Sequence, residues 1–335
     1  RGSSMHLLVT GGAGFIGSNF VRHVLDTRED WRISVLDRLT YAGNLDNLEG
    51  VLDDDRLEFV HGDILDQETV EASMNGIDAV VHLAAESHVD RSIISAEAAV
   101  QTNFTGSFRI FEAARAHGLT RVLHVSTDEV YGACFGDPFT ENDPLNPRNP
   151  YAATKAGADR MAYSYQVTYE LPVVIARPSN NYGPWQYPEK LIPFFTWRAL
   201  NDEHLPVYGD GMQIRDWLHV EDHCRALMLL LERGEPGEAY NIHGGSERPN
   251  METIRLILDE LGKPEGLIRH VEDRPGHDIR YAMDASKIGE LGWRPQVPWE
   301  QGIRETVRWF AEHVEWMRAS VERGKAYFDE WYKGR

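Results

Sequence analysis

Cysteine is nearly missing from this sequence, in which Cys134 and Cys224 are the only two. There is no C-x-x-C pair, and no group of histidines and cysteines has the spacing of metal ligands. We therefore predict neither a disulfide framework nor a metal site. Chains with so few cysteines are typical of a reducing compartment, so we expect the protein to be cytoplasmic.

Long hydrophobic runs are missing as well. No uninterrupted apolar segment approaches the ~20 residues that cross a bilayer, and no charged and then apolar leader follows Met5. We expect a protein that is neither exported nor attached to a membrane. Residues 1–4 (RGSS) are expected to be a remnant of the expression vector, with the natural chain beginning at Met5.

Positive charge is scarce: the chain has 34 Lys and Arg residues against 53 Asp and Glu, which gives a net charge of -19 at pH 7. Such a charge opposes binding to nucleic acid, although a few local cations can still hold one small anion. We expect a small-molecule substrate and no nucleic-acid partner. With 335 residues, of which 42% are hydrophobic, the chain exceeds what one core usually organises, so we expect two lobes.

Short apolar runs rich in strand formers alternate with helical patterns through the first half of the chain. The runs cover residues 6–10, 32–37, 57–63, 78–85, 121–126 and 171–177. This alternation predicts an α/β fold with a Rossmann-type, doubly wound parallel sheet that has helices on both faces.

The amino-acid composition changes from Arg177 onwards, where the segment RPSNNYGPWQYPEKLIP is rich in proline, asparagine and aromatic residues. We predict a dinucleotide-binding domain over residues 5–178 and a smaller, interleaved α/β lobe, mainly for the substrate, over 179–335. Some segments of the second half are expected to return to the first lobe. The remaining patterns predict helices at residues 220–231, 251–261 and 299–316, and short strands or connectors in PVYG and EAYNIHG.

Gly11, Gly14 and Gly17 form a GxxGxxG turn between the first predicted strand and helix. The unpaired N–H groups and positive dipole end of such a turn suit a pyrophosphate, although a tight turn without a ligand would show the same glycines. Asp37, at the end of the second strand, favours the first interpretation. Its carboxylate can bind both ribose hydroxyls and repels a 2′-phosphate, which predicts NAD over NADP despite the neighbouring Arg38.

Further cofactor contacts are expected where the third and fourth strands end. Asp63 and Ile64 can flank an adenine ring, although a plain turn would also account for Asp63. Ala84 and Ala85 are small enough for a cofactor to approach the backbone closely. The other expected cofactor contacts are Phe15, Ile16, Thr40, Leu83, Ser87, Thr102, Tyr151, Lys155 and Asn181.

YAATK places Tyr151 and Lys155 four residues apart on one face of a predicted helix that follows Pro150. On that face the ammonium group is predicted to lower the phenol's pKa from ~10, so that the tyrosine acts as a base while a hydride leaves for nicotinamide. An isolated YxxxK match is more often an exposed helical pair. The glycine turn, and Thr127 at the end of the preceding strand, favour the catalytic interpretation.

HVSTDEVYG sets Asp128 and Glu129 side by side where a predicted strand gives way to a turn. Reversible hydride transfer, as in an epimerase, needs neither of them. A dehydratase needs both an acid and a base, and adjacent carboxyls supply these if their environments separate their pKa values. A solvated turn or a helix cap is the structural alternative.

GxxGxxG, HLAAES, Thr127 and YxxxK together resemble the extended short-chain dehydrogenase/reductase superfamily. More narrowly, the chain resembles dTDP-glucose 4,6-dehydratases from Met5 onwards, through LTYAGNL, AAESHVDRSI, STDEVYG, NNYGPWQYPEKLIP, RDWLHVED and DRPGHDIRYA. This resemblance implies oxidation of dTDP-glucose at C4 by NAD, loss of water across C5 and C6, and return of the hydride to C6. It also implies that Asp128 protonates the leaving C6 oxygen, that Glu129 takes the C5 proton, and that the protein is a homodimer.

The expected substrate contacts, most of them implied by the resemblance, are Ser87, Thr127, Asp128, Glu129, Tyr151, Asn180, Lys190, Leu191, Pro206, Tyr208, Arg215, Asn250, Arg274 and His277. Arg215 is the best phosphate clamp, and its alternative is a salt bridge to Asp216 or Asp210. His277 could instead be a loop histidine bonded to Asp278. The alternative functions are a nucleotide-sugar epimerase or decarboxylase and, from another class, a non-catalytic dinucleotide sensor.

Overall fold

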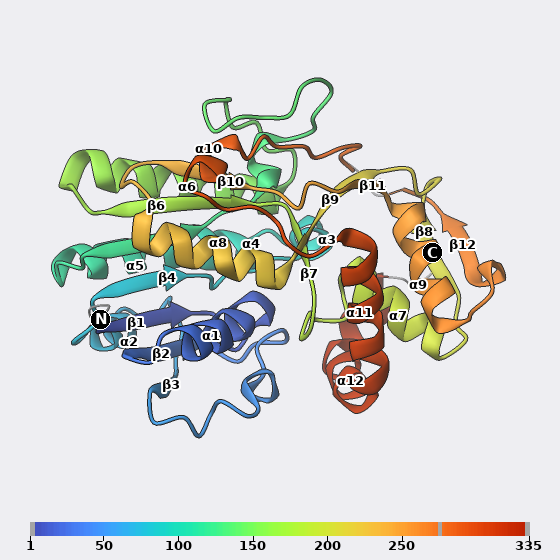
Figure 1. The fold of residues 1–335 in the computed structure, drawn as a ribbon, viewed down its shortest axis with the longest axis horizontal. Coiled ribbons are helices and arrows are strands. Elements are labelled where there is room, and N and C mark those ends of the chain that lie inside the picture. The colour runs from blue at the N-terminus through green and yellow to red at the C-terminus, as the bar shows by residue number, and fades with distance from the viewer. Residues whose placement is uncertain (1–3, 274–276, 332–335) are drawn as a thin grey trace.

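The structure is a computed structural model that describes residues 4–273 and 277–331. Two lobes lie side by side, a larger one built on a parallel sheet and a smaller one formed mostly by the C-terminal half (Figure 1). The fold is the predicted Rossmann-type α/β architecture.

The seven strands of the main sheet are all parallel and run in the order β10-β6-β5-β4-β1-β2-β3. They are β1 (Met5–Thr10), β2 (Trp31–Asp37), β3 (Leu57–His61), β4 (Ala79–His82), β5 (Arg121–Val125), β6 (Val173–Pro178) and β10 (Ala239–Ile242). The chain leaves β1 in one direction and returns at β4 on its other side. This reversal opens a crevice at the carboxyl ends of the strands, where ligands of such sheets bind.

Alternate strand residues face opposite sides of the sheet, and each side has its own core. Leu7 and Val9 pack with α1 (Phe15–Thr27) and α8 (Val220–Arg233), and Leu8 packs with the helices on the opposite side. Those helices are α2 (Gln67–Ser73), α5 (Ser107–Ala116) and α6 (Pro150–Tyr169). Burying both faces explains why the strands are almost continuously hydrophobic.

The first lobe also contains short helical segments. They are η1 (Leu45–Leu48), α3 (Val89–Ile94), α4 (Glu97–Ala99), the π-helix η2 (Val100–Gly106), the 3-10 turn η3 (Asp128–Tyr131) and α10 (Ser286–Glu290). Helix α6 begins with Pro150 after Asn149, whose side chain accepts a hydrogen bond from the N–H of Ala152. Proline at the first position and asparagine at the cap set the start of this helix, and with it the place of Tyr151.

The second lobe has its own core, between two small sheets and four helices. Its strands are β7 (Asn180–Tyr182), β8 (Leu205–Tyr208), β9 (Ile214–His219), β11 (Glu247–Pro249) and β12 (Ile268–Val271), in the orders β11-β9-β7 and β12-β8. Its helical segments are α7 (Leu191–Leu200), α9 (Asn250–Leu261), η4 (Glu265–Leu267), α11 (Trp299–Glu312) and α12 (Val314–Trp331).

Two features of the second half differ from the sequence patterns. The single helix predicted over residues 299–316 is two helices, because the backbone turns at His313 (φ -108°, ψ 38°). EAYNIHG contains a short strand, β10, as one of the two predicted possibilities, but this strand adds to the main sheet beside β6 and so returns to the first lobe. We retain the domain boundary near residue 178 as a proposal, with β10 and α8 belonging to the first lobe.

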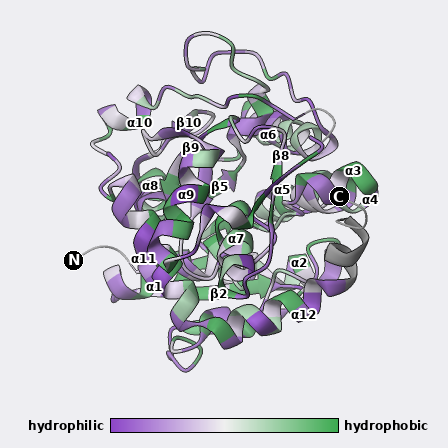
Figure 2. Ribbon diagram, turned by 90° about the vertical axis from the view of Figure 1, so that its right-hand side faces the viewer, coloured by the Kyte–Doolittle hydropathy of each residue, from purple (hydrophilic) through white to green (hydrophobic). Residues whose placement is uncertain are grey.

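Helix α12 lies back against the first lobe. The indole N–H of Trp316 donates to Asn47 Oδ1 (2.9 Å), and the amide of Asn47 donates to the carbonyl oxygen of Ala13 in the glycine turn (2.8 Å). Hydrophobic and hydrophilic residues alternate along α12 (Figure 2), and Met317 is fully buried. Among the helices of the described residues, none combines the length and hydrophobicity that crossing a membrane requires.

Candidate active site

One cavity of about 440 Å³ opens between the carboxyl ends of the main sheet and the second lobe. The predicted site residues that line it are Gly11, Gly14, Phe15, Ile16, Gly17, Asp37, Arg38, Thr40, Asp63, Ile64, Leu83, Ala84, Ala85, Ser87, Thr102, Thr127, Asp128, Glu129, Tyr151, Lys155, Asn180, Asn181, Lys190, Leu191, Pro206, Tyr208, Arg215, Asn250 and His277. Arg274 lies outside the described residues. Residues from both halves of the sequence therefore meet around one space.

The cofactor end of the cavity is built from close-packed backbone. Gly11 has φ 71°, and a Cβ there would lie 2.8 Å from the backbone of Ala84. A Cβ on Gly17 would collide with the carbonyl oxygen of Gly11, so the turn tolerates no side chain at either place. The turn leads into α1, whose positive end faces the cavity. This arrangement fits a dinucleotide pyrophosphate.

Asp37 is held by the backbone at the end of β2. Its Oδ2 accepts the N–H of Ala13 (3.0 Å) and its Oδ1 the N–H of Leu39 (2.8 Å). Burial raises the pKa of this carboxyl, and the two backbone hydrogen bonds oppose that shift. Arg38 turns to Asp63 (2.8 Å), so its charge is already met by an acid. A fixed carboxyl beside a paired arginine fits a ribose without a 2′-phosphate.

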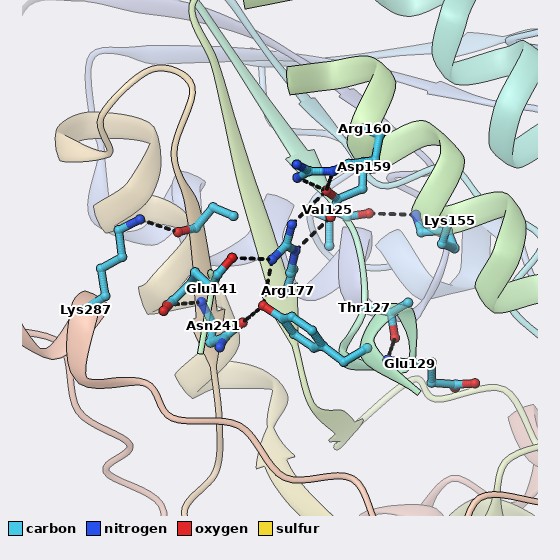
Figure 3. A network of polar contacts seen from close by, with 12 residues as sticks. Val125, Thr127, Glu129, Glu141, Lys155, Asp159, Arg160, Arg177, Asn241 and Lys287 are labelled. Carbon is cyan, nitrogen blue, oxygen red and sulfur yellow. Dashed lines mark hydrogen bonds and ion pairs between the residues drawn. The ribbon is translucent and has the colours of Figure 1, made fainter. Parts of the chain in front are cut away.

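Tyr151 and Lys155 lie on the first turns of α6 and are both buried. The Lys155 ammonium donates to the carbonyl oxygen of Val125 (2.7 Å), as Figure 3 shows. Burial lowers the pKa of Lys155 to about 8, although the charge of Asp159 opposes that change. Lys155 is therefore close to its titration point near neutral pH.

The prediction that Lys155 lowers the pKa of Tyr151 is wrong for the protein without a ligand. Burial raises the pKa of Tyr151, the charge of Glu129 raises it further, and the hydroxyl of Thr127 opposes the shift by hydrogen bonding. The rule for YxxxK pairs overlooked the loss of water around the phenol and the nearby acid. In this state Tyr151 keeps its proton.

Asp128 and Glu129 form the first turn of η3, and Thr127 is the residue that caps it. The Thr127 hydroxyl accepts the N–H of Glu129 (3.3 Å) and donates to Asp128 Oδ1 (3.1 Å). Burial raises the pKa of Asp128 well above its usual value, and the charge of Glu129 adds to this, whereas Thr127 and Arg215 oppose it.

Glu129 is in a different environment from Asp128. Asp128 is only 4% exposed, and its Oδ2 has no hydrogen-bond partner among the residues that the structure describes. Glu129 is partly exposed and receives a hydrogen bond from the Asn149 amide (3.3 Å). The two adjacent carboxyls thus lie in different environments, and burial favours the protonated form of Asp128, as an acid and base pair requires.

The cations at the sugar end contact backbone carbonyl oxygens. Lys190 donates to Ser87 (2.6 Å), and Arg215 donates to Ile214 (2.8 Å) and Asp278 (3.0 Å). The guanidinium of Arg215 also lies over a tyrosine ring, 4.4 Å from the centre of Tyr281. Both side chains thus place positive charge beside the cavity, where a diphosphate can use it.

The alternatives considered for Arg215 and His277 involve acids that have other partners. Asp216 accepts hydrogen bonds from Ser179 (2.7 Å) and from the backbone N–H groups of residues 244 and 246. His277 bonds Asp273 (2.6 Å), while Asp278 accepts the guanidinium of Arg148 (2.8 Å). The acid bonded to His277 Nδ1 is thus Asp273, and not the Asp278 that the alternative interpretation named.

Several buried polar atoms around the sugar end have no hydrogen-bond partner among the described residues. They are Asp128 Oδ2, Asn180 Oδ1, Gln213 Oε1 and Asn250 Oδ1, and all four residues line the cavity. An unsatisfied buried polar atom costs about 1–3 kcal/mol, so proteins retain few of them. Acceptors gathered around one cavity fit a ligand rich in hydroxyl groups.

Sequence reasoning missed several residues of the cavity wall. Among them are His88, Asp90, Gln186, Tyr187, Glu189 and Tyr281. Glu189 is buried and pairs with Arg91 (3.2 Å) next to Lys190 in the YPEK segment. The sequence did contain one signal for Glu189, because it is an acid directly before the predicted substrate cation Lys190 in a proline-rich segment.

Both cysteines are free and buried. Among residues 4–273 and 277–331, no three His, Cys, Asp or Glu side chains gather in a way that could hold a metal ion.

Comparisons with known proteins point to one family. Residues 8–306 match the model of the GDP-mannose 4,6 dehydratase family. The chain is 53% identical to the low-salt glycan biosynthesis protein Agl12 of Haloferax volcanii, with 91% of this chain and 98% of that protein covered. It is 49% identical to a dTDP-glucose 4,6-dehydratase of Streptomyces niveus, with 93% and 94% covered.

A solved structure gives the same picture. The crystal structure of DesIV, a dTDP-glucose 4,6-dehydratase from Streptomyces venezuelae with NAD bound, has a TM-score of 0.92 and 51% sequence identity. The match covers 94% of this chain and 100% of that one.

Proposed function

The chain belongs to the nucleotide-sugar dehydratase family described by the GDP-mannose 4,6 dehydratase model, and on this premise we propose that it is an NAD-dependent dTDP-glucose 4,6-dehydratase. It converts dTDP-glucose into dTDP-4-keto-6-deoxyglucose. The single observation that carries the proposal is the buried Asp128, whose Oδ2 has no partner among the described residues, next to the more exposed Glu129.

NAD fits the cofactor end because the glycine turn, Asp37 and the paired Arg38 suit a pyrophosphate and an unphosphorylated ribose. NAD bound there would supply a hydride acceptor for C4 and a hydride donor for C6, and its positive charge would favour the ionised form of Tyr151. Tyr151 then takes the proton of the C4 hydroxyl. Lys155 and Thr127 hold this end of the sugar against α6 and β5.

The acid pair performs the elimination. With C4 oxidised to a ketone, the C5 proton becomes acidic and Glu129 removes it. The electron pair of the C5–H bond forms the C5–C6 double bond. The C6 hydroxyl leaves with the proton of Asp128 as water. Glu129 then gives its proton to C5 as the hydride returns to C6, which completes the 6-deoxy sugar and restores the Glu129 carboxylate. Tyr151 passes the proton of the C4 hydroxyl to solvent, and Asp128 regains a proton from solvent.

A direct assay tests this function. The protein is incubated with dTDP-glucose, and the ketosugar product is followed through the absorbance of its enolate in base. We expect this absorbance to rise with time. Formation of dTDP-galactose instead would identify an epimerase, and unchanged dTDP-glucose would indicate a decarboxylase that needs another substrate or a non-catalytic sensor.

We also propose that the protein is a homodimer. Bulky apolar side chains are exposed on η2, α5 and α6, namely Phe104, Phe108, Tyr163, Val167 and Tyr169. The helix that carries YxxxK thus has an apolar outer side next to its neighbour, as a helix-to-helix interface between two copies requires. Analytical ultracentrifugation tests this: a monomer at micromolar concentration would contradict it.

We place the protein in the cytoplasm. Its two cysteines are free and buried, which suits a reducing compartment. Fractionation of the source cells, followed by immunoblotting, tests the location.

A further inference from the structure

A buried polar network lies behind the catalytic residues (Figure 3). Arg177, at the end of β6, is at its centre, with Asp159, Tyr131 and Asn241 around it. The side chains of Arg177 and Asp159 are 1% and 0% exposed. All four residues are outside the cavity lining, so none of them contacts a substrate held there.

One arm of the network reaches the helix of Tyr151 and Lys155. Arg177 donates to both oxygens of Asp159, from Nε (2.8 Å) and from Nη2 (2.9 Å). Asp159 lies one helical turn after Lys155 on the same face of α6. This two-pronged contact fixes α6 to the carboxyl end of β6 in both distance and orientation.

The other arm reaches the turn of the two acids. Arg177 Nη1 donates to the hydroxyl of Tyr131 (2.6 Å), which donates to Asn241 Oδ1 (2.7 Å). Tyr131 is the last residue of η3, only two positions after Glu129. The amide of Asn241 donates in turn to the carbonyl oxygen of Phe139 (3.0 Å). One guanidinium therefore connects the acid turn with the Tyr151 helix.

Stability alone does not explain this arrangement. Two buried charges lose their hydration, and apolar residues of similar size often stabilise a protein as well as a buried ion pair does. What an ion pair with directed hydrogen bonds adds is a fixed geometry. The reaction needs that geometry, because one sugar must meet Tyr151 at C4 and the acids at C5 and C6.

We propose that Arg177, through Tyr131 and Asp159, is a positioning group that holds the Asp128 and Glu129 turn in register with Tyr151 and Lys155. The proposal rests on the proposed dehydration. Oxidation at C4 uses Tyr151 and Lys155 of α6, Thr127 and the cofactor, whereas elimination also requires the acids to be in place. Loosening the Tyr131 arm therefore slows elimination and spares oxidation.

Tyr131→Phe is the sharpest test, because it removes one hydroxyl and leaves the ring in place. In a single turnover with dTDP-glucose, we expect reduced nicotinamide to form at a rate within about 2-fold of the wild type. We expect its decay, and the release of ketosugar, to slow by about 10- to 100-fold, as for a displacement of ~1 Å at a reacting group.

Tyr165→Phe is the matched control. Tyr165 is also a buried tyrosine whose hydroxyl makes one hydrogen bond, to Glu112, and it lies on α6 away from the acid turn. We expect this variant to keep the ratio of oxidation to elimination of the wild type. If Tyr131→Phe slows both steps equally, or changes the ratio no more than the control does, the proposal is overturned.

A second measurement does not depend on catalysis. Hydrogen–deuterium exchange of the ligand-free protein should become about 10-fold faster at the N–H groups of residues 129–132 in Tyr131→Phe, and unchanged there in Tyr165→Phe. Unchanged exchange in both variants would contradict the positioning role. If the wild-type protein makes no ketosugar, the proposed function is overturned. The anchoring of the turn is still supported in that case if exchange is faster in Tyr131→Phe and unchanged in Tyr165→Phe.

Discussion

The two ends of the cavity are built in different ways. At the cofactor end, backbone N–H groups already satisfy the carboxyl of Asp37, and the glycine turn is packed to contact. At the sugar end, Asp128, Asn180, Gln213 and Asn250 each keep a buried polar atom without a partner among the described residues. The polar groups of the cofactor end therefore have their hydrogen-bond partners within the protein, whereas those of the sugar end obtain theirs from the ligand.

This difference fits the two ligands. A cofactor that is regenerated in each cycle can remain bound, so its site gains from rigidity. The sugar changes shape and charge during the reaction, and groups that await its hydroxyls act on it most strongly when it is correctly placed. The following predictions are arranged to break one end and leave the other intact.

Glu129→Gln should have the largest effect, and it acts at the sugar end alone. The amide cannot take the C5 proton, so we expect elimination to fall by about 10²- to 10⁴-fold, the usual contribution of a general base. Oxidation should continue, so that reduced nicotinamide accumulates on the enzyme and is seen by its absorbance. Ketosugar formation at the wild-type rate would contradict the assignment of Glu129 as the base.

Gly17→Ala should break the cofactor end. The added Cβ collides with the carbonyl oxygen of Gly11, and overpacking of this kind costs about 1–3 kcal/mol. We expect NAD affinity, measured by calorimetry on protein stripped of cofactor, to fall by about 5- to 150-fold. Gly266→Ala is the control, since a Cβ there meets nothing within 4 Å. Equal affinities for the two variants would show that the turn does not hold the cofactor.

A pH series should also affect the two ends of the cavity differently, but by a smaller factor than the two substitutions above. Burial lowers the pKa of Lys155 to about 8, so its positive charge is present below that pH and is lost as the pH rises through it. We expect the rate of oxidation to drop roughly 5-fold from pH 8 to 9, as a single group requires. NAD affinity should change little over this interval. A rate that stays flat well above pH 8 would contradict a role for the charged lysine.

Trp316→Phe should have the smallest effect. It removes the indole N–H that bonds Asn47 and keeps an aromatic ring in α12. Since a typical hydrogen bond contributes about 0.5–1.5 kcal/mol, NAD should dissociate roughly 2- to 10-fold faster. Trp309→Phe, in the same aromatic cluster, is the control. The same dissociation rate in both variants would argue that α12 does not support the turn.

Most elements of the first lobe could be predicted from local sequence patterns. The strands β1 to β6, the glycine turn and the start of α6 at Pro150 follow from short apolar runs, glycine spacing and a proline, which act over a few residues. The same patterns brought the predicted cofactor and sugar residues together, because carboxyl ends of parallel strands share one edge.

Contacts between distant segments left no such pattern. A four-residue strand such as β10 can pair with either lobe, and only the packed structure decides. The bonds from Arg177 to Tyr131 and from Trp316 to Asn47 join segments 46 and 269 residues apart. The pKa of Tyr151 was mistaken for the same reason, since burial and Glu129, rather than the helix neighbour, determine it.

The contact between α12 and the glycine turn also bears on how the protein is made. Asn47 leaves the ribosome 269 residues before Trp316, its partner. The seventh strand, β10, likewise follows its neighbour β6 by dozens of residues. A nascent chain that already has its glycine turn and its YxxxK helix therefore still lacks the last support of that turn. Secure retention of the dinucleotide therefore requires that α12 has already been made.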